Sequence, residues 1–271
     1  MEIVSVVKGA GSGKALALLF GSLCFICLAA RSAVYAEEVR IASCLAGCPS
    51  GTPADNDVVA RPIYALSFNH SNALADWVAY RVTAGSIGIA TNLSREPIED
   101  PYLSDTLKPA DYAGAEQMGL VASYFVPMVS FARTPYWRDV NYLSNFVPRN
   151  SELNRGSWYG LEWAVRNLAS RAGEVYVTTG PIYDLESDSV TPLPRLPIDK
   201  PHRVPAAFYK IIAGSDGRIS AFLFDQNVEF YVHHCEHRTA VTTVEQLTGL
   251  DFFPEERQWP TGTLDAEIGC P

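Results

Sequence analysis

The stretch that decides the fold covers residues 141–162 and reads NYLSNFVPRNSELNRGSWYGLE. Its first part is a polar segment rich in asparagine, and its second part has apolar residues at helical spacing. The apolar positions of this pattern are Trp158, Leu161, Val165 and Leu168. Gly173 follows as a stop signal, so we predict a helix over residues 154–170 that opens at Asn154.

The predicted helix carries a polar stripe. Asn154, Trp158, Glu162 and Arg166 are four residues apart and would share one face. An amide oxygen is a ligand that Mg²⁺ accepts, and a guanidinium binds a phosphate through two parallel hydrogen bonds. The stripe therefore suits a hydrated cation beside a phosphate. A plainer interpretation stays open, in which Asn154 is only an N-cap and Glu162 and Arg166 form a surface ion pair.

The rest of the chain mixes strands and helices. Period-2 apolar patterns predict strands over residues 62–68, 76–82, 175–179, 208–213 and 219–224, and helical spacing predicts a second helix over residues 241–247. A Ser-Asp-Gly turn at 215–217 joins two of these strands as a hairpin. Hairpins with interspersed helices indicate an α+β domain.

The first 36 residues have the order of an export signal. Lysines precede an uncharged apolar run over residues 15–30, and small residues follow before Glu37. We expect residues 1–36 to be cleaved, which leaves one domain over residues 37–271 with a net charge of −11 in place of −9. A membrane anchor is the alternative, because the run is only slightly shorter than a span. The acidic net charge means that any phosphate site must be a local cluster of basic residues.

Four cysteines remain after cleavage: Cys44, Cys48, Cys235 and Cys270. An even count in an exported chain indicates two disulfides, for which three connectivities exist. Pairing Cys44 with Cys48 and Cys235 with Cys270 is the simplest of them. The alternative is a zinc site formed by Cys235 with the neighbouring His233, His234 and His237.

Several blocks of this sequence, in one order, resemble the DNA/RNA non-specific endonucleases of the ββα-metal class. They include CLAGCP at 44–49, WVAY at 77–80, PADY at 109–112, the stretch at 141–162, TGPIY at 179–183, PAAFYK at 205–210, AFLFDQN at 221–227 and the final Gly269-Cys270. The resemblance implies a ββα-metal nuclease fold, with a central antiparallel sheet flanked by helices. It also implies the same two cysteine pairs.

The resemblance assigns roles to single residues. Asn154 is similar to the one protein ligand of a hydrated Mg²⁺, and Glu162 to the carboxylate that holds metal-bound water. Arg95 and Arg166 resemble the arginines that contact the scissile phosphate, and Asn145 a supporting residue of the site. Arg149 stands where many relatives carry Gln.

The Asp-Arg-Gly-His signature of the family, whose His is the general base, is missing. The gap-free register places Val121-Ala122-Ser123-Tyr124 at the signature, so Tyr124 stands at the base position, 30 residues before Asn154. A phenol with a pKa near 10 is a poor base at neutral pH compared with an imidazole near 6.5. We expect a severe loss of general-base catalysis.

The resemblance implies a secreted or periplasmic, Mg²⁺-dependent endonuclease that hydrolyses phosphodiester bonds in DNA and RNA, with activity reduced by the missing His. DNA and RNA would bind through phosphate contacts, so without sequence preference. A homodimer is a further partner to be considered, and no stable membrane association is expected after signal cleavage. The alternative is a catalytically degenerate relative that binds nucleic acid or metal.

Overall fold

The computed structural model describes residues 40–185, 195–256 and 258–271. The expected signal peptide at residues 1–36 lies outside the described residues. None of the helices in the described ranges is both long and apolar enough to cross a membrane.

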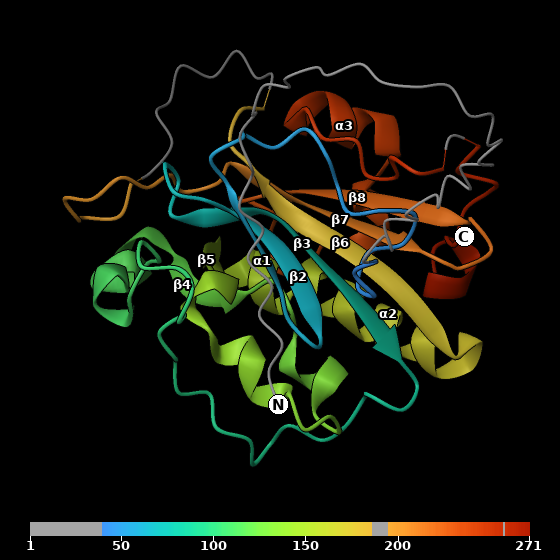
Figure 1. The fold of residues 1–271 in the computed structure, drawn as a ribbon, viewed down its shortest axis with the longest axis horizontal. Helices are drawn as coiled ribbons and strands as arrows, with labels where there is room; N and C mark the ends of the chain where they lie inside the picture. The colour runs from blue at the N-terminus through green and yellow to red at the C-terminus, as the bar shows by residue number, and fades with distance from the viewer. Residues whose placement is uncertain (1–39, 186–194, 257) are drawn as a thin grey trace, which may run out of the picture. The chain divides into compact units, whose positions relative to one another are not determined.

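A seven-stranded antiparallel sheet forms the centre of the fold (Figure 1). Its strands lie in the order β1-β2-β3-β6-β7-β8-β9. Their bounds are β1 Asp57–Ala60, β2 Tyr64–Asn69, β3 Leu74–Thr83, β6 Glu174–Ile182, β7 Ala207–Ala213, β8 Ile219–Asp225 and β9 Arg238–Thr239. All five predicted strands and the hairpin, now β7 and β8, are confirmed, with bounds that differ by a few residues, as the ends of elements commonly do.

Both faces of this sheet are covered. On one face, helix α2 (Ser157–Ala172) packs its apolar side against residues such as Val78, Val177 and Phe208. On the other, helix α3 (Val241–Thr248) adds Val244 to a second cluster around Trp77 and Tyr209. Figure 1 shows α2 and α3 on opposite sides of the sheet. The fold is the α+β arrangement of an antiparallel sheet flanked by helices.

A second, two-stranded sheet stands beside the first. It pairs β4 (Leu120–Tyr124) with β5 (Phe146–Asn150). The sequence patterns did not predict either strand, because β5 contains a proline and two polar residues and the sequence of β4, LVASY, does not alternate apolar and polar residues. Helix α1 (Ser151–Arg155) follows β5 without a loop and leads directly to α2.

The single helix predicted over residues 154–170 is therefore corrected to two. The N-cap of the first helix, α1, is Asn150, whose side chain accepts a hydrogen bond from the Glu152 backbone N–H at 2.8 Å. Gly156 then interrupts the chain between α1 and α2 with φ −92° and ψ −114°. Because α1 begins after Asn150, Asn154 lies inside this helix, and the alternative interpretation of Asn154 as the N-cap is wrong.

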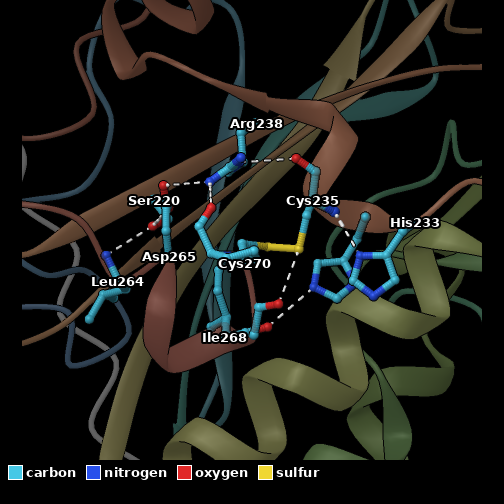
Figure 2. Close-up of a disulfide and its surroundings, with 11 residues drawn as sticks. Ser220, His233, Cys235, Arg238, Leu264, Asp265, Ile268 and Cys270 are labelled. Carbon is cyan, nitrogen blue, oxygen red and sulfur yellow. Dashed lines mark hydrogen bonds and ion pairs between the residues drawn. A yellow bond between two sulfur atoms is a disulfide. The ribbon is translucent and has the colours of Figure 1, made fainter.

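Both expected disulfides are present. Cys44 bonds to Cys48, and Cys235 to Cys270. In Figure 2 the second bond lies next to His233, which accepts a hydrogen bond from the Cys235 backbone N–H. His233, His234 and Cys235 do lie within 4.8 Å of one another. The disulfide removes the thiolate on which the alternative zinc site depends.

Candidate active site

Strands β4 and β5 and the two helices that follow carry four of the residues singled out by the sequence, namely Tyr124, Asn154, Glu162 and Arg166, whereas Arg95 and Asn145 lie outside these elements. Tyr124 pairs with Phe146 across the two strands, and Leu120 pairs with Asn150, the residue that caps α1. This direct passage from strand to helix places Asn154 of α1 beside β4. The unit is thus two antiparallel strands followed by a helix interrupted at Gly156.

The amide oxygen of Asn154 accepts two hydrogen bonds. One comes from the Ser123 hydroxyl at 2.5 Å, and the other from Nη1 of Arg149 at 3.1 Å. The same Arg149 nitrogen also donates to the Ser123 hydroxyl at 2.7 Å and to the Tyr124 carbonyl at 3.2 Å. Because guanidinium has no acceptor, the amide atom that faces Arg149 has to be the oxygen.

Arg149 is completely buried. Its guanidinium carbon lies 3.8 Å from the ring centre of Trp158 and 4.7 Å from that of Phe208. Burial lowers the pKa of Arg149 to about 9, although the nearby Glu162 carboxylate opposes the shift. The side chain therefore keeps its positive charge at pH 7. Its Nε and Nη2 have no hydrogen-bond partner among the described residues.

Glu162 of α2 is surrounded by donors and cations. The Trp158 indole N–H donates to it at 2.9 Å, Lys210 Nζ lies 3.6 Å away, and Arg166 Nη1 lies 4.0 Å away. Burial lowers the pKa of Lys210 to about 8, and Glu162 opposes this shift. Arg166 is only 7% exposed. The surface ion pair considered as the plain alternative is therefore a largely buried one.

Tyr124 ends β4 with its ring centre 4.6 Å from that of Phe146. Burial raises the pKa of its phenol above 10, and the charge and hydrogen bonding of the neighbouring Arg95 oppose the shift only in part. Consecutive strand residues face opposite sides, so Ser123 faces Asn154 while the Tyr124 ring faces Phe146 and Arg95. Arg95 itself is exposed to solvent.

Asn145 has a positioning role in this arrangement. Its amide oxygen accepts from the Val126 backbone N–H at 2.9 Å, and its amide nitrogen donates to the carbonyls of Val140 and Val126 at 2.8 Å and 3.2 Å. It is completely buried. These bonds tie the segment after β4 to the segment before β5.

A cavity of about 350 Å³ opens beside Asn154. It is lined by Glu116, Gly119, Leu120, Val121, Ser151, Asn154 and Arg155. With one acidic and one basic side chain, the cavity has no excess of either charge. Asn154 is half-buried, so part of this residue faces the cavity.

Two residues of the site received no role from the sequence. In the sequence, Ser123 is aligned with the missing Asp-Arg-Gly-His signature without a role of its own. Lys210 is only the last residue of the matching block PAAFYK. The signal for Lys210 is present, since it is a cation within the apolar run AFYKIIA of strand β7 and is completely buried there. A lysine in such a run requires a buried carboxylate, which Glu162 supplies.

The family model for DNA/RNA non-specific endonucleases matches residues 46–258 of this chain. The chain belongs to the DNA/RNA non-specific endonuclease family. It is 35% identical over 247 residues to a nuclease of Serratia marcescens, covering 85% of this chain and 90% of that one. It is 28% identical to nuclease C1 of Cunninghamella echinulata, with 79% and 89% covered.

The solved structures agree with the ββα-metal nuclease fold. The EndoG/EndoGI complex contains a chain that superposes with a TM-score of 0.65 at 23% identity, covering 77% of this chain and 90% of that chain. The relatives are nucleases, so this chain is placed among the endonucleases, hydrolases that act on nucleic acids. The family is one of metal-dependent nucleases.

Proposed function

We propose that this chain hydrolyses phosphodiester bonds of DNA and RNA without sequence preference, at the site formed by β4, α1 and α2, and at a reduced rate. The observation that carries the proposal is that Arg149 links Asn154 of α1 to Trp158 of α2, within a chain that matches the family over residues 46–258. Trp158 in turn donates a hydrogen bond to Glu162, which lies 4.0 Å from Arg166. Contacts limited to phosphate and sugar would give no sequence preference.

In this proposal the arginines supply most of the remaining catalysis. Water attacks phosphorus, one P–O bond forms and the bond to the leaving oxygen breaks. Arg95 and Arg166 offset the charge that develops on the phosphate oxygens. The attacking water must give up a proton, and a neutral Tyr124 phenol is a poor acceptor for it at pH 7. The rate is limited at this step.

The Mg²⁺ predicted at Asn154 does not fit the site as the side chains lie. The oxygen that would bind the ion accepts hydrogen bonds from Ser123 and from the cation Arg149. A carboxamide oxygen has two lone pairs, and both are used here. We therefore derive no catalytic step through a metal.

These same contacts favour a second function, binding of nucleic acid without hydrolysis. The general base of the resembled site is replaced in this chain, and the oxygen of Asn154 already accepts two hydrogen bonds, while Arg95 and Arg166 remain to contact phosphate. Such a protein would hold DNA or RNA and leave it intact.

Plasmid nicking by the purified mature protein separates the two functions. We expect slow nicking that Arg95→Ala reduces, because this exposed arginine would contact phosphate. Arg138→Ala is the matched control, since Arg138 is also exposed and has no ion pair among the described residues. Assays in Mg²⁺ and in EDTA, with Asn154→Ala beside the wild type, test the metal. Binding of a labelled oligonucleotide without any nicking would establish the second function.

We further propose that the protein is exported after cleavage of residues 1–36 and acts outside the cytoplasm, without stable attachment to a membrane. The two disulfides support this, because such bonds persist in oxidising compartments. Mass spectrometry of the purified protein should find Glu37 at its N-terminus. Light scattering on the same sample tests the homodimer.

A further inference from the structure

The orientation of the Asn154 amide is set by Arg149. Ser123 can donate or accept a hydrogen bond, so on its own it would tolerate either orientation of the amide. Arg149 can only donate, and its Nη1 lies 3.1 Å from Asn154 Oδ1. Since Arg149 is completely buried, the amide oxygen faces the interior and the amide NH₂ group faces away from Arg149.

We propose that Arg149 takes the place of the divalent cation in this site, holding the Asn154 amide oxygen inward so that the chain has no metal ligand there and offers phosphate the Asn154 amide N–H groups instead. The proposal rests on the proposed function for the identity of this site as the place where phosphate binds. Its consequence is a nucleic-acid site that works independently of divalent cations.

Electrostatics support the replacement. The guanidinium is held away from water against the rings of Trp158 and Phe208, so its charge is poorly screened. A dication at the same amide oxygen would lie next to this fixed positive charge in a region of low dielectric. Glu162 offsets part of the charge, but it is shared with Lys210 and Arg166.

The first test measures Mn²⁺ binding to the wild-type protein by electron paramagnetic resonance, with Asn154→Ala as the comparison. We expect no saturable binding that depends on Asn154. One Mn²⁺ bound per chain in the wild type, and lost in Asn154→Ala, would overturn the proposal. This test uses the native chain and does not depend on the stability of a variant at Arg149.

The second test asks whether removing the charge restores the metal. In Arg149→Gln the new amide can accept from Asn154 as well as donate to it, so the Asn154 oxygen is free to turn outward. We expect Mn²⁺ binding that depends on Asn154 to appear in this variant, at an affinity roughly 10- to 100-fold above the upper limit measured for the wild type, the scale of changes next to metal ligands. The double variant Arg149→Gln, Asn154→Ala should lose the gain.

Arg149→Lys is the matched control, because lysine keeps the charge and is also only a donor. It should bind Mn²⁺ no better than the wild type. A folded Arg149→Gln with no gain, or an equal gain in Arg149→Lys, would contradict the proposal.

The nicking assay keeps this inference distinct from the proposed function. If the inference holds and the chain is a nuclease, nicking is unchanged in EDTA. Nicking abolished by EDTA, together with Mn²⁺ binding at Asn154, overturns the inference and leaves the nuclease. If neither nicking nor Mn²⁺ binding is observed, the proposed nuclease activity is wrong, and the inference that Arg149 replaces the cation still holds.

Discussion

Two buried cations, Arg149 and Lys210, lie against the same indole ring. The Arg149 guanidinium carbon is 3.8 Å from the Trp158 ring centre, and Lys210 Nζ is 3.9 Å from it. Glu162 is the carboxylate next to this pair, and it is also near Arg166. Buried charge is costly unless it is neutralised nearby, so this cluster holds more positive charge than Glu162 can balance. Besides burial, the positive charge of Arg149 and Arg166 lowers the pKa of Lys210.

Lys210→Met should reveal this cost in the pH dependence of stability. In the wild type the pKa of Lys210 is about 8, against 10.5 when unfolded, so the folded state loses the proton first. Between these values the unfolded chain binds more protons, and the wild-type free energy of unfolding rises with pH relative to the variant. We expect a rise of about 1 kcal/mol per pH unit between pH 8 and 9.5, measured by urea unfolding.

Lys108→Met serves as the control, because Glu99 raises the pKa of Lys108 and moves its titration above this window. Its difference from the wild type should not change between pH 8 and 9.5. A flat difference for Lys210→Met as well would show that Lys210 is not perturbed by its burial.

Tyr124→His should increase nicking at pH 7. Burial keeps the Tyr124 phenol neutral well above pH 7, whereas an imidazole has a pKa near the working pH and can accept the proton of water. General-base catalysis is worth about 10²- to 10⁴-fold, and we expect a gain within that range. Initial rates of plasmid nicking from pH 6 to 10 measure it. Tyr124→Phe should show no gain. Equal nicking rates for Tyr124→His and Tyr124→Phe would show that the residue at position 124 does not act as the general base.

At the scale of elements, Gly156 separates the helix that carries Asn154 from the helix that carries Glu162. A Cβ atom here would lie 2.4 Å from the Phe230 carbonyl oxygen and 2.9 Å from that of Glu152. Both neighbours are backbone atoms, so the chain itself would have to move. The stripe expected on one continuous helix is thus carried by two helices whose join requires glycine.

Gly156→Ala should destabilise the protein by roughly 1–3 kcal/mol, the cost of overpacking, and lower the urea midpoint. Gly160→Ala, one turn along α2, is the matched control. Its Cβ would meet only His234 Nδ1 at 3.4 Å, and alanine favours the helix by up to about 1 kcal/mol. We expect opposite signs for the two variants. A Gly156→Ala protein as stable as the wild type would show that the join can move without cost.

The sequence predicted the elements whose periodicity is regular and missed those set by tertiary contacts. The β7–β8 hairpin and α3 follow from local pattern alone. The strands β4 and β5 form because they pair with each other and lead into α1, which no local pattern announces. In the site, the residues were found by resemblance, but the orientation of Asn154 depends on Arg149 and Ser123, whose side chains meet only in the fold.

At the scale of the whole molecule, the net charge, −9 for the full chain and −11 after the expected cleavage, opposes nucleic acid at long range. Any attraction to phosphate must therefore come from the few cations at the site, which act over about one Debye length, roughly 8 Å at physiological salt. A chain of this kind would bind nucleic acid weakly until a phosphate reaches the site.

The two disulfides should contribute unequally to stability. The bond between Cys235 and Cys270 spans 35 residues, and Cys270 is buried at the end of the chain beside Arg238 and Asp265 (Figure 2). The bond between Cys44 and Cys48 spans only four. Because the loss of entropy in the unfolded chain grows with loop length, we expect about 4 kcal/mol from the first and about 2 kcal/mol from the second.

Urea unfolding of Cys235→Ser, Cys270→Ser and of Cys44→Ser, Cys48→Ser measures this difference. The first pair of substitutions should lower the midpoint more, and it frees the C-terminal segment that carries Asp265, a hydrogen-bond partner of Ser220 on β8. The second acts only on a short loop at the start of the described chain. Each double variant keeps the disulfide that the other one lacks, so the two variants serve as controls for each other. Equal midpoints would mean that the hydrogen bonds of Arg238 to the Cys235 and Pro271 carbonyls hold the terminus without the bond.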